Sequence, residues 1–359
     1  MKIINENNPR ITFEEELFIN HKEKERSGHL GHAMVECKNG DILAFYSNCS
    51  GHRGMGNSGG HTMYGWVEYK RSTDRGITWS EPTVLDYSYD CFVDGMNYIG
   101  CEKCVMCDDG RLVLFCLRNM GGDFEPYDTP VYLISYDNGY TWSEPFEFSN
   151  ERGRVFDAVY KDGKIYALQL CDYCEDILVI KKGQVTYKIF VSENNGESFS
   201  PISELTFESR GYFYGNLIFR EDNSLVFYAY KRDDEYTLSC HISEDMGKTW
   251  GEHFEVKVDK IARNPQVSYL KGYYILQGRS ENGVNFVFYH SKDAINWSEG
   301  VIVSELLDNK PRGGCYYSNT LNVVGDDGVE RLLVQYSEQY AHGCARVNIM
   351  HAWIEISGM

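Results

Sequence analysis

Long apolar runs and proline are both scarce in this sequence of 359 residues. No segment approaches the roughly 18 consecutive apolar residues that a membrane-spanning helix requires. The N-terminal residues Met1–Pro9 lack the apolar core of a secretory signal peptide. The chain has only 8 prolines, which argues against long proline-rich linkers. These absences predict a cytoplasmic protein without a membrane span.

Basic residues are also fewer than acidic ones. The chain has 35 Lys and Arg residues and 53 Asp and Glu residues, so its formal net charge is −18. Nucleic acids and anionic membranes attract basic surfaces, so neither is an expected partner. A small anionic substrate stays compatible with this charge, since one pocket can be basic within an acidic protein. No phosphate-binding glycine loop precedes a helix, so we expect no cofactor. The sequence leaves the oligomeric state open.

The 12 cysteines are compatible with disulfides or with free thiols. Without a signal peptide, free thiols in a reducing compartment are expected. Cys101, Cys104 and Cys107 have a spacing typical of metal ligands, but strand alternation would place Cys104 on the opposite face from the other two. We therefore expect these thiols to be buried and to bind no metal. A metal site formed by histidines is the alternative, although the residues concerned lack a clear ligand spacing: His29, His32, His52 and His61.

A short motif recurs along the chain. Its starts are separated by 63, 57, 51 and 48 residues, so one four-stranded unit fits each interval. Repeats of this length are typical of propellers and arrays, in which neighbouring units bury each other's apolar faces. The copies are Ser72–Trp79, Ser135–Trp142, Ser192–Phe199, Ser243–Trp250 and the shorter Ser291–Trp297.

Each copy has the chemistry of a hairpin turn. The Asp side chain can accept hydrogen bonds from backbone N–H groups, and Gly can adopt the positive φ that other residues resist. The Trp or Phe that ends the motif is expected to pack between neighbouring sheets. Five similar copies cannot share one active site, so we expect these aspartates to be structural rather than catalytic.

These motifs resemble the Asp-boxes, or BNR repeats, of the sialidase superfamily. The resemblance extends from about Gly31 to Ile356 and implies an all-β fold, a six-bladed β-propeller of four-stranded antiparallel sheets. We expect residues 1–359 to form one such domain. Each Asp-box would follow the third strand of a blade, and Ile11–Phe18 is predicted to close the ring as an additional strand of the last blade.

This arrangement places the entrances to the inner strands on one face, together with the loops that join the second and third strands. Several Arg, His and Tyr residues fall at these places, and clustered guanidinium groups are suited to bind a carboxylate or sulfate. The Asp-boxes would lie on the opposite face. The predicted substrate-binding residues are His32, Arg53, Arg154, Tyr214, Arg232, Arg279 and Arg312.

The strongest catalytic signal is Tyr317, which resembles the covalent nucleophile of sialidases. Arg279 and Arg232 resemble two of their carboxylate-binding arginines. The chain departs from the family at three places. Leu30–His32 replaces the first arginine, the loop before the first Asp-box lacks the acidic Asp, and Tyr214–Asn216 lacks the glutamate that pairs with the tyrosine.

Other residues could supply the missing groups. Glu102 and Asp157 enter from neighbouring inner strands and could form the carboxylate pair of a glycoside hydrolase. Asp157 could equally be the ion-pair partner of Arg154. His61, or His32, could act as an acid or base near neutral pH. The predicted catalytic residues are therefore Tyr317, Glu102, Asp157 and His61, without a metal.

The expected function is a glycoside hydrolase of the sialidase superfamily, acting in the central channel on terminal residues of acidic or unusual saccharides. Its partner would be a saccharide with an anionic group. Two alternatives remain open. One is a lyase for uronate-type saccharides, with a His or Tyr base and arginines that neutralise the carboxylate. The other is a propeller that binds glycans without catalysis.

Overall fold

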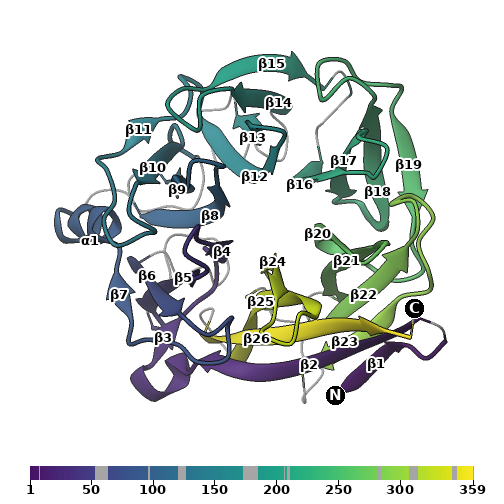
Figure 1. Cartoon of the computed structure of the whole chain (residues 1–359), viewed down its shortest axis with the longest axis horizontal. Coiled ribbons are helices and arrows are strands. Elements are labelled where there is room, and N and C mark those ends of the chain that lie inside the picture. Colours follow the sequence, from purple (N-terminus) through teal and green to yellow (C-terminus); the bar gives the residue numbers. More distant parts are fainter. Residues whose placement is uncertain are drawn as a thin grey trace.

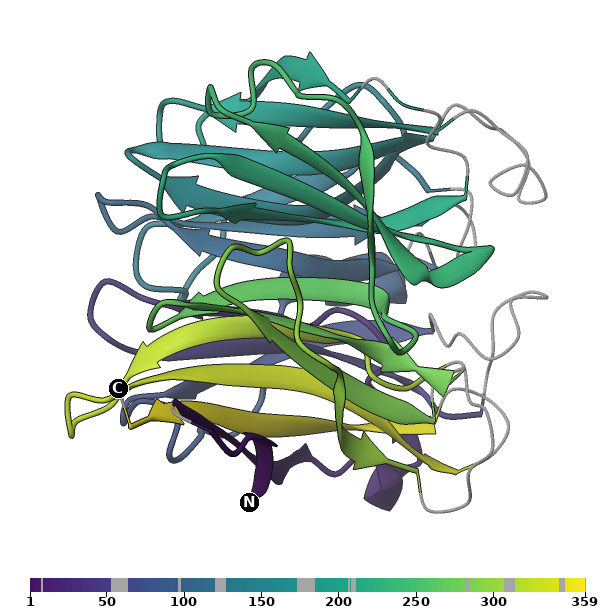
Figure 2. The same cartoon turned by 90° about the vertical axis from the view of Figure 1, so that its right-hand side faces the viewer.

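The computed structural model describes residues 1–7, 9–52, 64–95, 98–119, 127–172, 185–205, 207, 211–281, 284–306, 314–341 and 346–358. In these residues six antiparallel sheets are arranged as blades around a central axis (Figure 1). The strands run between the two faces of the propeller, as the view from the side shows (Figure 2). The predicted fold class, a six-bladed all-β propeller, is confirmed.

Each blade contains a meander of four antiparallel strands, to which the first and sixth blades add one more, and the first strand of each meander lies nearest the axis (Figure 1). The first blade contains β4 (Ala33–Glu36), β5 (Ile42–Ser50), β6 (Gly65–Ser72) and β7 (Thr83–Val84), with β3 (Arg26–Ser27) also paired to β5. The second contains β8 (Ile99–Met106), β9 (Leu112–Arg118), β10 (Val131–Ser135) and β11 (Phe146–Glu147). The third contains β12 (Gly153–Lys161), β13 (Lys164–Asp172), β14 (Val185–Ser192) and β15 (Ser200–Glu204). The fourth contains β16 (Tyr212–Phe219), β17 (Leu225–Lys231), β18 (Asp234–Ser243) and β19 (Phe254–Lys257). The fifth contains β20 (Arg263–Leu270), β21 (Tyr273–Ser280), β22 (Asn285–Ser291) and β23 (Val301–Glu305).

The sixth blade combines both ends of the described chain. It contains β24 (Ser318–Val324), β25 (Glu330–Ala341) and β26 (Arg346–Ser357), followed by β2 (Arg10–Ile19) and β1 (Lys2–Asn5). β2 pairs with β26 along almost its whole length, with Ile11 opposite Ile356. The predicted closing strand is thereby confirmed, and pairing it removes an exposed edge from β26.

The Asp-boxes form the turns that follow the third strands, as predicted. In the second blade, Asp137 accepts hydrogen bonds from the backbone N–H of Thr141 at 2.9 Å and from its hydroxyl at 2.7 Å. Gly139 adopts φ +77°, and its N–H donates to the Ser135 hydroxyl. In the shorter fifth copy Asp293 makes the equivalent bonds to residue 296, without a glycine. The structural role expected for these aspartates is confirmed.

The aromatic residues that end the motifs pack between neighbouring sheets. Trp142 of the second blade meets Phe45 of the first, with ring centroids 5.7 Å apart. Phe199 of the third blade meets Phe115 of the second at 5.5 Å. The core therefore consists of apolar layers between successive blades, which is how repeats of this type stabilise one another.

The cysteines of the described residues are free thiols. The expectation that Cys104 lies on the opposite face from Cys101 is wrong, because both belong to the apolar cluster between the first two blades. The reason is a β-bulge between Cys101 and Lys103, which shifts the alternation by one residue. Cys107 instead packs between the second and third blades. Within the described part, no group of three or more His, Cys, Asp and Glu side chains could hold a metal ion.

The helical elements described in the structure include η1 (His21–Lys24), a short 3-10 turn, and α1 (Asp86–Val93), which joins the first two blades. Among the residues that the structure describes, no helix has the length and apolar character needed to cross a bilayer.

Candidate functional site

A small cavity lies at the propeller axis, where the inner strands of all six blades begin. Its volume is about 40 Å³, which leaves room for a few water molecules but not for a sugar ring. Residues from β8, β12, β16 and β20, from the start of β24 and from the segment before β4 line it. They are Leu30, Gly31, His32, Cys101, Glu102, Arg154, Phe156, Tyr214, Asn264, Gln266, Tyr317, Ser318 and Asn319.

Glu102 and Arg154 form a buried ion pair in this cavity. Nη2 of Arg154 lies 2.9 Å from Oε2 of Glu102, and both side chains are less than a tenth exposed. Burial raises the pKa of Glu102, although the charge and hydrogen bond of Arg154 oppose this effect. Within the described residues, Oε1 of Glu102 and Nε and Nη1 of Arg154 have no hydrogen-bond partner. Buried polar atoms of this kind normally have partners, so they are available to a polar ligand.

Tyr317 lies among positive charges in the same cavity. The guanidinium of Arg279, from β21, is 5.0 Å from its ring centroid. Burial opposes ionisation of Tyr317, but the charges of Arg279, Arg263 and Arg154 outweigh it. Together with a hydrogen bond from Tyr214 they lower the pKa of Tyr317 below its ordinary value near 10. The arginines therefore favour the phenolate form of Tyr317.

Arg263 and Asn264 were not among the predicted site residues. They are the first two residues of β20, a position similar to that of Arg154, the second residue of β12. Asn264 lines the cavity and is 3% exposed. Neither Nδ2 nor Oδ1 of its side-chain amide has a partner in the described part of the chain. Position at an inner-strand entrance was the signal that could have identified both residues.

Irregular strand pairing orients these side chains. The inner strands β8, β12, β16 and β20 each contain a register shift within a few residues of their start. Tyr214 adopts φ +52° and Asn264 φ +54° at two of these shifts. Bulges redirect side chains and are frequent beside active sites.

Asp157 has a different environment from Glu102. Its Oδ1 lies 3.0 Å from Nζ of Lys103, and its Oδ2 accepts hydrogen bonds from Nδ2 of Asn216 at 2.5 Å and from the N–H of Leu217 at 2.9 Å. Lys103 also donates to Asn319 at 3.1 Å. Oδ1 of Asn216 accepts from the N–H of residue 267 at 2.8 Å.

We call these four residues the polar belt: Lys103, Asp157, Asn216 and Asn319. Their contacts connect the inner strands of the second, third, fourth and sixth blades, and Asn216 also contacts the inner strand of the fifth. Asp157 does not pair with Arg154, whose ion-pair partner is Glu102. Asp157 does not line the cavity either.

His32 lines the cavity but is buried and neutral. Burial lowers its pKa to about 3. Its Nδ1 lies 3.3 Å from Nε2 of Gln335, on β25. At neutral pH this imidazole can take part in hydrogen bonding but carries no proton to donate as an imidazolium.

The structure brings together Tyr317, Glu102, Arg154, Tyr214, His32 and Arg279 from the predicted set. Arg232 is exposed and lies near Phe213, with its guanidinium carbon 5.9 Å from that ring and outside the cavity lining. The remaining predicted residues lie outside the described residues: Arg53, His61 and Arg312.

Comparison with known proteins identifies the repeat and the fold. The sequence model of the BNR/Asp-box repeat matches residues 70–81, the first copy of the motif. No curated protein matches the chain in sequence.

Solved structures match the fold over almost the whole chain. A protein of unknown function from Dyadobacter fermentans is 13% identical with a TM-score of 0.74, over 97% of this chain and 99% of that one. The Hadza microbial sialidase Hz136 is 14% identical with a TM-score of 0.63, over 96% and 68%. An α-L-arabinanase from Penicillium chrysogenum, complexed with arabinobiose, is 14% identical with a TM-score of 0.59, over 93% and 94%. The chain therefore has an Asp-box repeat and a six-bladed propeller fold shared with sialidases and other glycoside hydrolases.

Proposed function

We propose that this protein is a glycoside hydrolase that acts on a terminal, anionic sugar residue at the propeller axis, with Tyr317 as its nucleophile. The observation that carries the proposal is the position of Tyr317 against Arg279, in a cavity that also holds Glu102. A phenol near its ordinary pKa is a weak nucleophile at neutral pH, whereas one surrounded by cations is activated.

The arginines also account for substrate selection. A sugar carboxylate beside Arg279 and Arg263 would be attracted by both positive charges, with bidentate geometry available from each guanidinium. Asn264 and the free polar atoms of Arg154 are placed to bind hydroxyl groups. Because the cavity is smaller than a sugar ring, side chains at its mouth must move when substrate binds.

The reaction has two balanced steps. The phenolate oxygen of Tyr317 attacks the anomeric carbon, the glycosidic C–O bond breaks, and Glu102 gives its proton to the leaving oxygen. Water then attacks the anomeric carbon, loses a proton to Glu102, and releases Tyr317 as a phenolate. A carboxyl group whose pKa is raised by burial is suited to the first proton transfer.

The test is a panel of glycosides with terminal acidic sugars, incubated with the full chain and analysed by mass. Hydrolysis adds one water to the sum of the products. A lyase would instead form an unsaturated product with new ultraviolet absorbance, and a binding protein would form no product. A fluorinated sugar that slows the second step should label the wild-type protein on the peptide that contains Tyr317, and should not label Tyr317→Phe.

Two substitutions separate the catalytic groups. Tyr317→Phe should abolish turnover of every active glycoside, and Glu102→Gln should slow glycosides with poor leaving groups more than those with good ones. If both variants retain wild-type turnover, the proposal is wrong.

A further inference from the structure

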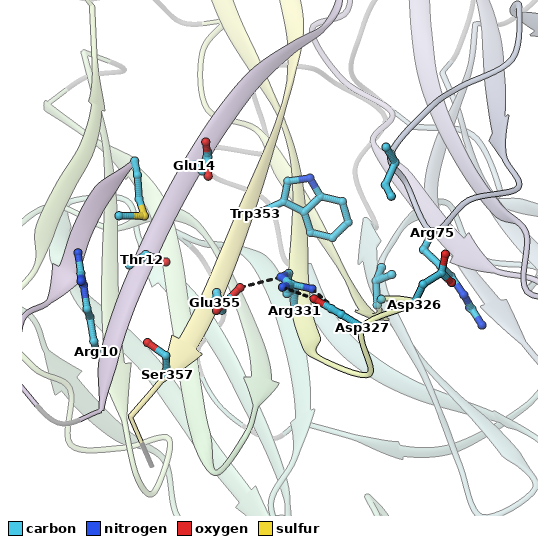
Figure 3. Close-up of a pocket in the computed structure, with 14 residues that line it drawn as sticks. Arg10, Thr12, Glu14, Arg75, Asp326, Asp327, Arg331, Trp353, Glu355 and Ser357 are labelled. Carbon is cyan, nitrogen blue, oxygen red and sulfur yellow. Dashed lines mark hydrogen bonds and ion pairs between the residues drawn. The ribbon is translucent and has the colours of Figure 1, made fainter.

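A second cavity, of about 740 Å³, lies at the junction between the sixth and first blades (Figure 3). Its floor is one face of the sixth sheet, from β2, β25 and β26. Its other wall contains Arg75 and Ile77, from the Asp-box of the first blade. Asp-box turns and inner-strand entrances lie at opposite ends of the strands, so this groove is separate from the axial cavity.

The two sheets that border the groove differ in extent. β2 and β26 have 10 and 12 residues, whereas β7, the outer strand of the first blade, has 2. The groove lies over part of the sixth sheet, between that sheet and the Asp-box of the first blade. Alternate residues of β2 and β26 face the opening, among them Thr12, Glu14 and Trp353 (Figure 3).

Trp353 provides a flat apolar surface in the groove. The edge of its ring packs against Gly76, where an added Cβ would lie 3.0 Å from the indole. The ring is only partly buried, and Ile77, which is 72% exposed, lines the same cavity. An indole held by backbone on one side offers a rigid stacking surface at low entropic cost.

Fixed polar groups surround this surface. Arg331 is held by both oxygens of Asp327, at 3.1 and 2.7 Å, and by Glu355 at 2.7 Å (Figure 3). These planar groups retain unused acceptor positions and are oriented before any ligand binds. The ionisable side chains that line the groove nearly balance in charge: Arg10, Arg75 and Arg331 against Glu14, Asp326, Asp327 and Glu355.

We propose that this groove binds a neutral oligosaccharide. The C–H face of a sugar ring would stack on Trp353, and its hydroxyl groups would exchange hydrogen bonds with the Arg331, Asp327 and Glu355 cluster. Near-balanced charge disfavours a strongly ionic ligand, and the volume lies within the range of about 300–1,000 Å³ typical of ligand sites. The groove would then hold a glycan chain apart from the site of reaction.

In the experiment, the full chain is titrated with neutral cello-, malto-, xylo- and arabino-oligosaccharides, and binding is measured by calorimetry and by tryptophan fluorescence. At least one series should bind saturably, and Trp353→Ala should weaken it at least about tenfold. Ile77→Arg obstructs the groove from an exposed position and should do the same without loss of folding. The matched control is Ile302→Arg on β23 of the fifth blade, where the isoleucine is 40% exposed and does not line the groove.

Tyr317→Phe should leave this binding unchanged, so the groove and the axial site are tested independently. The proposal is overturned if no neutral oligosaccharide binds, or if Ile77→Arg and Trp353→Ala both bind with wild-type affinity. It is also overturned if Ile77→Arg dissociates a dimer of the wild-type chain, because the groove would then be an interface between two copies.

Discussion

The guanidinium of Arg279, on β21 of the fifth blade, lies 5.0 Å from the ring centroid of Tyr317, at the start of the sixth blade. Arg279 is 3% exposed and Tyr317 is 7% exposed, so little water separates the charge from the phenol. Electrostatic interactions are stronger in such surroundings than at the surface. This contact links a feature of the fold, the junction of two blades, to the ionisation of one hydroxyl group.

Removal of that charge should change the pH dependence of the reaction. In Arg279→Gln the phenolate of Tyr317 loses a stabilising cation, so its pKa should rise, and the rise of kcat/KM with pH should occur at higher pH. Arg279→Lys keeps the charge and should shift the profile less. The pH–rate profile and the tyrosinate difference absorbance measure the same ionisation. Arg232→Gln, at an exposed arginine outside the cavity, should have the wild-type profile. An unchanged profile in Arg279→Gln would show that Tyr317 is not the titrating group.

The two adjacent tyrosines provide a matched pair. Tyr316 is fully buried and stacks on Phe286 with ring centroids 5.1 Å apart, whereas Tyr317 lines the cavity. Tyr317→Phe should lower kcat at least about a thousandfold with a near-wild-type melting temperature. Tyr316→Phe should retain most of the activity. Equal activities of the two variants would remove the assignment of Tyr317 as nucleophile.

Asp157 should contribute to stability more than to chemistry. Its carboxylate contacts Lys103, Asn216 and the N–H of Leu217, so Asp157→Ala leaves the partly buried ammonium group of Lys103 without its ion-pair partner. Loss of one member of a buried pair destabilises a protein by about 3–5 kcal/mol, which urea unfolding can measure. Asp108→Asn, at an exposed turn, should change stability by less than about 0.5 kcal/mol.

The milder Asp157→Asn distinguishes the two roles that the sequence allows. If the residue positions the inner strands, this variant should be less stable but should keep its turnover per folded molecule. Full stability with lost turnover would instead support the catalytic role.

The Asp-box of the fourth blade should lose its contribution to stability in acid. The backbone N–H and the hydroxyl of Thr249 bind the carboxylate of Asp245 and lower its pKa to about 2. Unfolded Asp titrates near 4, so the stabilisation is complete above that pH and disappears as the pH falls towards 2. Asn194 occupies the same position in the third blade, where its amide oxygen accepts from the N–H of Ser198.

Asp245→Asn should therefore fold normally, and its deficit in melting temperature relative to wild type should shrink between pH 5 and pH 2.5. Thermal unfolding at several pH values is the measurement. A deficit that is constant over this range would mean that the carboxylate charge does not contribute to the turn.

The blades could be predicted from the sequence because each Asp-box is a local structure. The hydrogen bonds of Asp137 are made within four residues, so the motif identifies its turn without knowledge of the rest of the molecule. The closing strand could also be predicted, since closure of a ring of sheets requires a strand that pairs with β26. The positions of Tyr317 and Arg154 then followed from the order of strands within a blade.

Contacts between blades were harder to predict. Alternation alone would place Arg154 and Asp157, three residues apart, on opposite faces of β12, but the bulge between Val155 and Asp157 shifts this register by one residue. The pairing of Arg154 with Glu102, rather than with Asp157, depends on how two neighbouring sheets are rotated about the axis. The role of Asn264 likewise depends on its positive φ, which its residue type permits but does not require.

Because β2 completes the sixth blade, the hydroxyl of Tyr336 bonds to the carboxylate of Glu15 across 321 positions of sequence. Contacts between such distant segments form slowly, since loop closure must precede them. The axial cavity is lined by residues of all six blades, so its formation requires the closed ring. During folding, the axial cavity is consequently completed late, and partly assembled chains would present the twelve residues of β26 as a template for pairing with other chains.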